Sequence, residues 1–225
     1  MTDSDVDTVE VDWILTKTSI VKRINKIFQR NPNLFFTEHD IHSVLYNIAE
    51  EELQRHGVLS AKTSDSREVS LVHHEYPTPF RCCMKGYGFQ LKYEKPYRRG
   101  HYDLVILNPS FVKNYELPVV YGKDYQRFSL AMQEVTVEPL IWVCEVVFFP
   151  KVKGIPKNAL RIIKQDALKV KETLKHKVGR DVNFCKMGSV LVFINHTAKG
   201  IADLKRQIDR LAEHLNLEVI LATAQ

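Results

Sequence analysis

The chain has 225 residues, of which 44% are hydrophobic and 26% charged, and its formal net charge is +5. These values are those of an ordinary globular protein with a real core. No uncharged apolar stretch approaches the roughly 20 residues of a membrane helix, so we expect no membrane-spanning helix and no membrane partner. Four cysteines without a CxxC pair indicate neither a disulfide framework nor a structural zinc site, so we expect an intracellular, cytoplasmic protein.

Residues 1–12 carry five acids and no lysine or arginine, and we expect them to form a flexible acidic leader. Residues 13–225 are expected to form one domain. Without the leader, 32 basic residues stand against 22 acidic ones, a net charge of +10. This excess favours a polyanionic partner such as nucleic acid, although many plain soluble proteins carry a similar charge.

Two amphipathic helices are predicted first. Apolar residues recur at helical spacing from Ile20 to Phe28, and Asn31-Pro32 ends this helix. A second helix begins after Thr37, a typical N-cap residue, with Glu38 in its first turn, where the helix dipole favours an anion. Gly57 ends it, and a polar link follows.

The rest of the chain alternates strand and helix patterns. Residues 110–138 are expected to be an insertion with some secondary structure, because structureless loops of that length are uncommon. The whole order predicts an α/β fold with a central mixed β-sheet flanked by helices. Strands are predicted at 69–76, 89–93, 102–107, 139–150, 188–195 and 218–222, and helices at 156–178 and 201–215.

The most informative stretch is PLIWVCEVVFFP, from Pro139 to Pro150, an apolar run with Glu145 in its middle. Such a run predicts a strand that is buried on both faces. A lone buried carboxylate is costly unless it has a partner. Glu145 is therefore either half of a core salt bridge, or a residue at a strand end near solvent, or a metal ligand, since a cation reverses the cost of burying negative charge.

The helix that follows this strand has two stripes. One is apolar and runs from Leu160 to Leu174. The other is basic and lies about a quarter turn away; it is either a solvated face or a surface that contacts phosphates. We call it the basic ridge, and it consists of Lys157, Arg161, Lys164, Lys171 and Lys175.

Acids occur on successive predicted strands, with Glu75 in LVHHEYPTP, Asp103 in RRGHYDLVILNP and then Glu145, before the helix segment IKQDALKV. In this order of motifs and elements the chain resembles the PD-(D/E)xK, or restriction-endonuclease-like, nuclease superfamily from about Phe36 to the C-terminus. The resemblance implies that Asp103 and Glu145 bind Mg²⁺ or Mn²⁺ and that the protein hydrolyses phosphodiester bonds. It also makes Glu75 and Glu38 candidates for extra ligands, against a solvated strand end and a helix-start charge as the plain alternatives.

The chain departs from the superfamily pattern at position 147, where a lysine is expected and Val147 stands. Valine cannot coordinate a metal or move a proton, which leaves three accounts. The lysine has migrated, with Lys164 the first candidate and Lys151 the second. Alternatively, the metal and Asp103 suffice at a reduced rate. Otherwise the site is inactive, and the fold serves nucleic-acid binding or complex assembly.

Other residues are candidates for contacts with nucleic acid. Arg98 and Arg99 precede Asp103 and could grip a phosphate, and His101, two residues before Asp103, would share its face. Adjacent strand residues face opposite ways, so His73 and His74 do not suit one zinc ion. DNA is favoured over RNA as the partner, and a homodimer would suit double-strand cutting.

Overall fold

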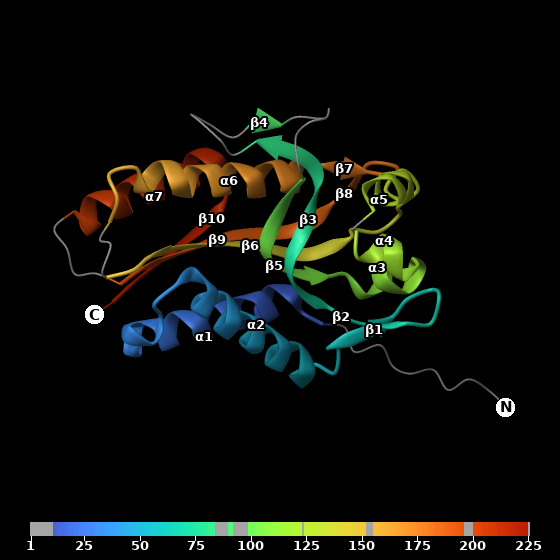
Figure 1. The fold of residues 1–225 in the computed structure, drawn as a ribbon, viewed down its shortest axis with the longest axis horizontal. Helices are drawn as coiled ribbons and strands as arrows, with labels where there is room; N and C mark the ends of the chain where they lie inside the picture. The colour runs from blue at the N-terminus through green and yellow to red at the C-terminus, as the bar shows by residue number, and fades with distance from the viewer. Residues whose placement is uncertain are drawn as a thin grey trace.

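The structure is a computed structural model that describes residues 11–83, 90–91, 99–122, 124–151, 155–195 and 200–224. Its centre is a mixed β-sheet with helices on both faces (Figure 1), which confirms the predicted α/β class with a central mixed sheet. Nearly all of the predicted leader lies outside the described residues. Asp12, which the sequence assigned to that leader, is the N-cap of the first helix and accepts hydrogen bonds from Ile14 N and Leu15 N.

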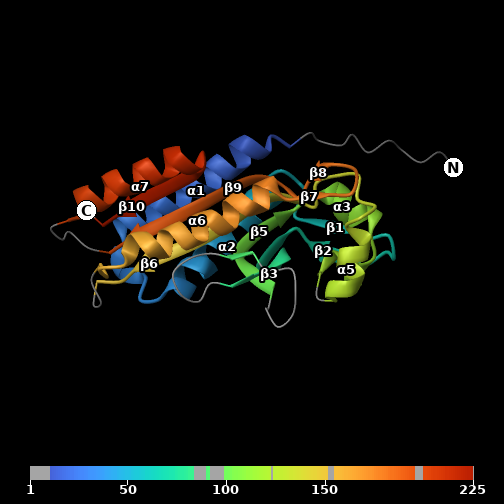
Figure 2. The same cartoon turned by 90° about the horizontal axis from the view of Figure 1, so that it is seen from above.

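The helices occupy two layers. Figures 1 and 2 show α1 and α2 on one face of the sheet and α6 and α7 on the other. Thr37 and Asp40 form a capping box that starts α2 where the sequence predicted it. The helical elements are α1 (Trp13–Arg30), η1 (Pro32–Leu34), α2 (Glu38–Arg55), α3 (Pro109–Asn114), α4 (Leu117–Val120), α5 (Tyr125–Ala131), α6 (Ala159–Lys175) and α7 (Ile201–Leu215).

The main sheet has the strand order β10-β9-β6-β5-β3-β4 among the described residues. Strands β6, β9 and β10 are parallel, whereas β5 and β3 follow β6 in antiparallel pairing. Two small hairpins, β1-β2 and β7-β8, stand apart from it. The strands are β1 (Ser60–Lys62), β2 (Glu68–Ser70), β3 (Val72–Cys83), β4 (Gln90–Leu91), β5 (Arg99–Leu107), β6 (Leu140–Phe149), β7 (Lys177–Val178), β8 (Val182–Asn183), β9 (Cys185–Ile194) and β10 (Glu218–Thr223).

Strand β3 differs from the prediction, which ended this strand at Tyr76 before two prolines. The observed strand continues through Pro77 and Pro79 to Cys83. Its register with β5 shifts between Pro77 and Arg81, and prolines are tolerated at such irregularities because they remove only a ladder donor. The prolines therefore mark a bulge in the strand and not its end.

The predicted insertion, residues 110–138, contains most of α3 and all of α4 and α5. These helices bury apolar side chains in the main core, among them Phe111, Val120 and Phe128. Elsewhere on the sheet, α6 approaches β9 closely at Gly188. A Cβ atom there would lie 2.4 Å from a methyl group of Val170, so the glycine permits this approach.

All ten residues of β6 are buried, but the two halves of the strand have different neighbours. The first half pairs with β5 on one side, up to Leu104 opposite Cys144, and with β9 on the other. From Glu145 to Phe149 the described pairing is with β9 alone. The sheet therefore opens between β5 and β6, and we call this opening the fork.

Candidate metal and active site

Two carboxylates accept hydrogen bonds from backbone amides of β6 at the fork. The Val146 N–H donates to Asp103 Oδ2 over 2.7 Å, and the Phe148 N–H donates to Glu38 Oε2 over 3.3 Å. These alternate amides point to the side of the strand that has lost its ladder partner, and a buried amide without an acceptor is costly. The opening of the sheet thus brings a β5 acid and an α2 acid to the same strand.

Glu145, next along β6, is paired with Lys169 of α6. The residue is 1% exposed, and its Oε2 lies 2.6 Å from Lys169 Nζ. The same ammonium group donates to the backbone carbonyl of His101 over 2.9 Å. The second oxygen, Glu145 Oε1, is buried and has no hydrogen-bond partner in the described structure. Half of this carboxylate is therefore left for a ligand.

Asp166 lies one turn before Lys169 on α6. Burial raises the pKa of Asp166 to about 7, and the charges of Asp103 and Glu38 act in the same direction, against Lys169. Burial also raises the pKa of Glu145 well above its usual value, and Asp103 and Asp166 add to the rise. Although burial alone would lower the pKa of Lys169, Glu145 and Asp166 outweigh it and raise that pKa.

Glu38 belongs to the same electrostatic group. The residue as a whole is exposed, but the pKa of its carboxyl group is raised. Desolvation is the larger cause, and repulsion from Asp103 is the second. We call Glu38, Asp103, Glu145, Asp166 and Lys169 the fork cluster. It contains four carboxylates and one ammonium group, so negative charge exceeds positive charge in a largely dry place.

This donor set fits a hard divalent cation. Mg²⁺ and Mn²⁺ prefer carboxylate oxygens, and a cation would compensate the charge that raises the pKa values here. The unpartnered Glu145 Oε1 is the clearest available donor. Among the described residues, no preformed group of three His, Cys, Asp or Glu donors is present.

The lysine beside Glu145 is not one that the sequence favoured. Lys164 and Lys151, the two candidates, are both exposed, whereas Lys169 is 7% exposed and contacts Glu145. A signal was present in the sequence. Asp166 and Lys169 are three residues apart, so they share one helix face, and they border the apolar stripe next to Val170.

His42 is a second residue that the sequence analysis missed. It lies one turn after Glu38 on α2, is 8% exposed, and its Nε2 is 3.7 Å from Asp103 Oδ2. Burial lowers the pKa of His42, although Asp103 and Glu75 oppose this. His42 Nε2 also lacks a hydrogen-bond partner in the described structure. Its spacing of four from Glu38 would have placed both on one helix face.

Glu75 stands at the edge of the site. It is exposed, and it lies opposite Asp103, because His74 pairs with Leu104 and Tyr76 with Tyr102. Its φ of 52° is left-handed, a conformation that costs a non-glycine residue about 1 kcal/mol or more. Glu75 therefore marks a strained point in β3 beside Asp103.

The remaining predicted contacts are on the surface or outside the description. His101 is exposed, and only its carbonyl group joins the fork cluster. Arg98 lies outside the described residues, and Arg99 is described only as part of the β5 backbone. Within the basic ridge, Lys171 is half-buried and the other four residues are exposed.

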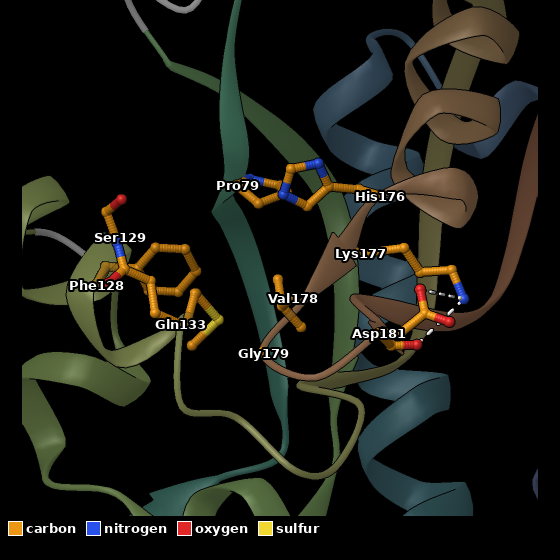
Figure 3. Close-up of a pocket in the computed structure, with 10 residues that line it drawn as sticks. Pro79, Phe128, Ser129, Gln133, His176, Lys177, Val178, Gly179 and Asp181 are labelled. Carbon is orange, nitrogen blue, oxygen red and sulfur yellow. Dashed lines mark hydrogen bonds and ion pairs between the residues drawn. The ribbon is translucent and has the colours of Figure 1, made fainter.

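A cavity of about 540 Å³ lies elsewhere, between α5, β3 and the β7-β8 hairpin (Figure 3). His176, Lys177 and Asp181 contribute polar groups to it, and Lys177 Nζ lies 3.6 Å from Asp181 Oδ1. None of its lining residues belongs to the fork cluster. The cavity and the fork are thus separate features.

In the described part of the chain, no helix is both long enough and apolar enough to span a membrane. The sequence matches no protein-family model and no curated protein, and the fold matches no solved structure.

Proposed function

We propose that this protein is a metal-dependent nuclease-like hydrolase of nucleic-acid phosphodiester bonds, with Asp103 and Glu145 as its metal ligands. The observation that carries the proposal is the fork cluster. Acids from adjacent strands meet at the point where the sheet opens, and a buried lysine contacts one of them. Charge at such a place attracts a divalent cation and, through it, a phosphate.

The element order supports a restriction-endonuclease-like core. A helix with Glu38 precedes three antiparallel strands, β3, β5 and β6, and α6 then leads to β9, which is parallel to β6. The acids of the resembled motif occupy β5 and β6 in this order. The proposal therefore rests on motif and topology together.

Lys169 supplies the function that the superfamily assigns to a strand lysine. Val147 shares the face of Glu145, is 2% exposed and belongs to the apolar core. The ammonium group of Lys169 reaches Glu145 from the helix above. This is the account in which the lysine has migrated, with a different residue in the role.

Each residue of the fork cluster would have a separate role in hydrolysis. A bound Mg²⁺ or Mn²⁺ would neutralise phosphate charge and lower the pKa of water. Asp103 and Glu145 would hold the ion, each with the oxygen that its present partner leaves free. Lys169 would stabilise negative charge on the phosphate from within a site that excludes bulk water. Glu38 and Asp166 add negative potential that favours a cation.

A second function is favoured by the contacts that already exist. Glu145 is paired with Lys169, and Asp103 and Glu38 cap amides of β6, so each acid has a structural role without any metal. This arrangement also suits a catalytically silent protein that binds nucleic acid or assembles a complex.

Cleavage assays on single- and double-stranded DNA and RNA with Mg²⁺ or Mn²⁺ separate the two functions. We expect Asp103→Asn and Glu145→Gln to lower the cleavage rate roughly 10³-fold or more, because a ligand charge is lost while the side-chain shape stays. The matched control is Asp203→Asn, an exposed acid on α7 that pairs with Arg206. Cleavage that survives both fork substitutions contradicts the proposed site, and tight binding by an inert wild type favours the second function.

A further inference from the structure

The corner between α1 and α2 exposes two large apolar side chains. Leu34 is 62% exposed, and Phe36 is 76% exposed, more than any other large apolar residue whose side chain is described. Single exposed apolar residues are common on protein surfaces. This corner, however, is held by hydrogen bonds on both sides and adjoins the fork.

The backbone of the corner is held firmly from both sides. The amide of Phe36 donates to Asp40 Oδ2 over 2.8 Å, and Asn195 Nδ2 donates to the carbonyl group of Pro32 over 2.9 Å. Between them, Phe35 is 2% exposed and packs on Phe28 with ring centroids 5.5 Å apart. The exposed ring of Phe36 thus projects from a fixed backbone and would lose little freedom on binding a ligand.

The corner adjoins the fork. Phe36 is two residues from Glu38, so the two Cα atoms are at most about 7 Å apart, and Glu38 reaches the amide of Phe148. Asn195, whose side chain donates to the Pro32 carbonyl group, also donates its backbone N–H to the Phe149 carbonyl group at the end of β6. A ligand that occupies the fork would therefore pass close to the corner.

Two exposed cationic side chains belong to the segments that meet at this corner. Arg30 ends α1 two residues before Pro32. Lys151 is two residues beyond Phe149, whose carbonyl group accepts from Asn195. An aromatic ring near cations is the combination that binds single-stranded nucleic acid, because bases stack on the ring while the cations contact the phosphates. A duplex offers no free base face, since its bases already stack on one another.

We propose that Phe36, with Leu34 beside it, stacks on an unpaired base next to the phosphodiester at the fork. The substrate is then single-stranded nucleic acid or a single-stranded end, bound without preference for base sequence. This inference rests on the proposed function, because it takes the fork as the place where the phosphodiester lies.

Fluorescence anisotropy of the full chain in EDTA tests it without cleavage. The probes are a short labelled oligo-dT, an abasic oligomer of the same length and a blunt duplex. Phe36→Ala should weaken oligo-dT binding roughly 5- to 100-fold and leave the abasic oligomer and the duplex unchanged. Phe36→Trp should retain binding, and Leu130→Ala, which removes a 57% exposed side chain from α5, should have no effect.

The outcomes distinguish this inference from the proposed function. If Phe36→Ala binds oligo-dT like the wild type, or loses the abasic oligomer equally, the stacking role is overturned. A change in sedimentation of Phe36→Ala without a change in oligo-dT binding also overturns it and assigns the corner to self-association. If the wild type cleaves nothing while Phe36-dependent binding of oligo-dT is found, hydrolysis fails and the stacking surface stands.

Discussion

Two groups of acids in the described structure each contain a buried glutamate, and they are neutralised to different degrees. On α2, Glu52 is 6% exposed and has two arginines within reach, Arg55 at 2.9 Å and Arg23 at 3.4 Å. Arg23 also pairs with the neighbouring Glu51. This group has two acids and two bases, which is what a purely structural ion-pair network requires.

The fork cluster lacks that balance. Four carboxylates share one ammonium group, and the pKa values of Glu38, Glu145 and Asp166 are all raised, chiefly by desolvation. The chain can place arginines beside a buried acid, as it does at Glu52, but among the described residues the fork cluster has Lys169 as its single cation. A fold that leaves such repulsion in place usually does so at a functional site, because a ligand cation supplies the missing charge.

The largest expected effect comes from removing Lys169, the cation of the fork cluster. Lys169→Met keeps the apolar stem but leaves Glu145 without its partner, so we expect the cleavage rate to fall about 10²- to 10⁴-fold. The free energy of unfolding should fall by about 3 kcal/mol, at the lower end for an unpaired buried charge, since Glu145 can take up a proton. Cleavage assays and urea unfolding measure the two effects.

Lys164→Met is the matched control, because it removes an exposed lysine from the same helix. It should leave the stability unchanged and lower the rate at most a few-fold, as expected for the loss of one residue of the basic ridge. A larger loss of cleavage in Lys164→Met than in Lys169→Met would return the catalytic role to the lysine that the sequence favoured. The comparison between the two buried groups would then no longer bear on catalysis.

Much of the fork was predictable, because strand burial follows from local pattern. The apolar run from Pro139 to Pro150 gave a strand buried throughout, and the order of Asp103 and Glu145 gave acids on neighbouring strands. The identity of the lysine was not predictable in this way. It depends on how closely α6 approaches the sheet, which Gly188 permits, and on which bordering side chain then reaches Glu145.

The opening of the sheet could not be predicted from the sequence either. Period-two patterns show which residues are buried, but they do not show where two strands stop pairing. Here pairing ends at Leu104 and Cys144, and Asp103 takes the place of the lost ladder acceptor. For the same reason, the strand predicted at 69–76 ends just before the point where the register between β3 and β5 merely shifts.

A smaller expected effect is a difference between the two acidic groups in how stability depends on pH. Because the pKa of Asp166 is raised in the folded state, to about 7 from 3.8, its stabilising contribution is present below pH 3.8 and is lost as the pH rises to 7. In EDTA, Asp166→Asn should therefore melt at a higher temperature than the wild type at pH 8 and at a similar temperature near pH 4. The gain should be several degrees, since each kcal/mol moves the melting temperature by roughly 2–4 °C in a chain of this size.

Glu52→Gln provides the contrast. It breaks a neutralised pair and should lower the free energy of unfolding by about 1–3 kcal/mol at pH 8, with no gain. Thermal melts of both variants across this pH range give the answer. If Asp166→Asn is destabilised at pH 8 as Glu52→Gln is, the fork acids are as well compensated as the acids of α2, and the imbalance described above does not exist.

The smallest expected effect concerns positive charge outside the fork. Lys169 of α6 faces inward, whereas Arg161, Lys164 and Lys175 of the same helix are exposed, so α6 would contact both the metal site and the nucleic-acid backbone. Replacing Lys157, Arg161 and Lys175 with glutamine should weaken binding only a few-fold at moderate salt. Each lost phosphate contact should flatten the slope of log Kd against log salt by about 0.7–0.9. Lys175 should contribute least, because it already lies 3.5 Å from Glu172.

The control for this variant is Lys22→Gln with Lys26→Gln on α1, an exposed pair on the opposite face of the sheet. Equal flattening per charge removed in the two variants would show that nucleic acid is attracted by net charge alone, and the basic ridge would then be only a solvated surface.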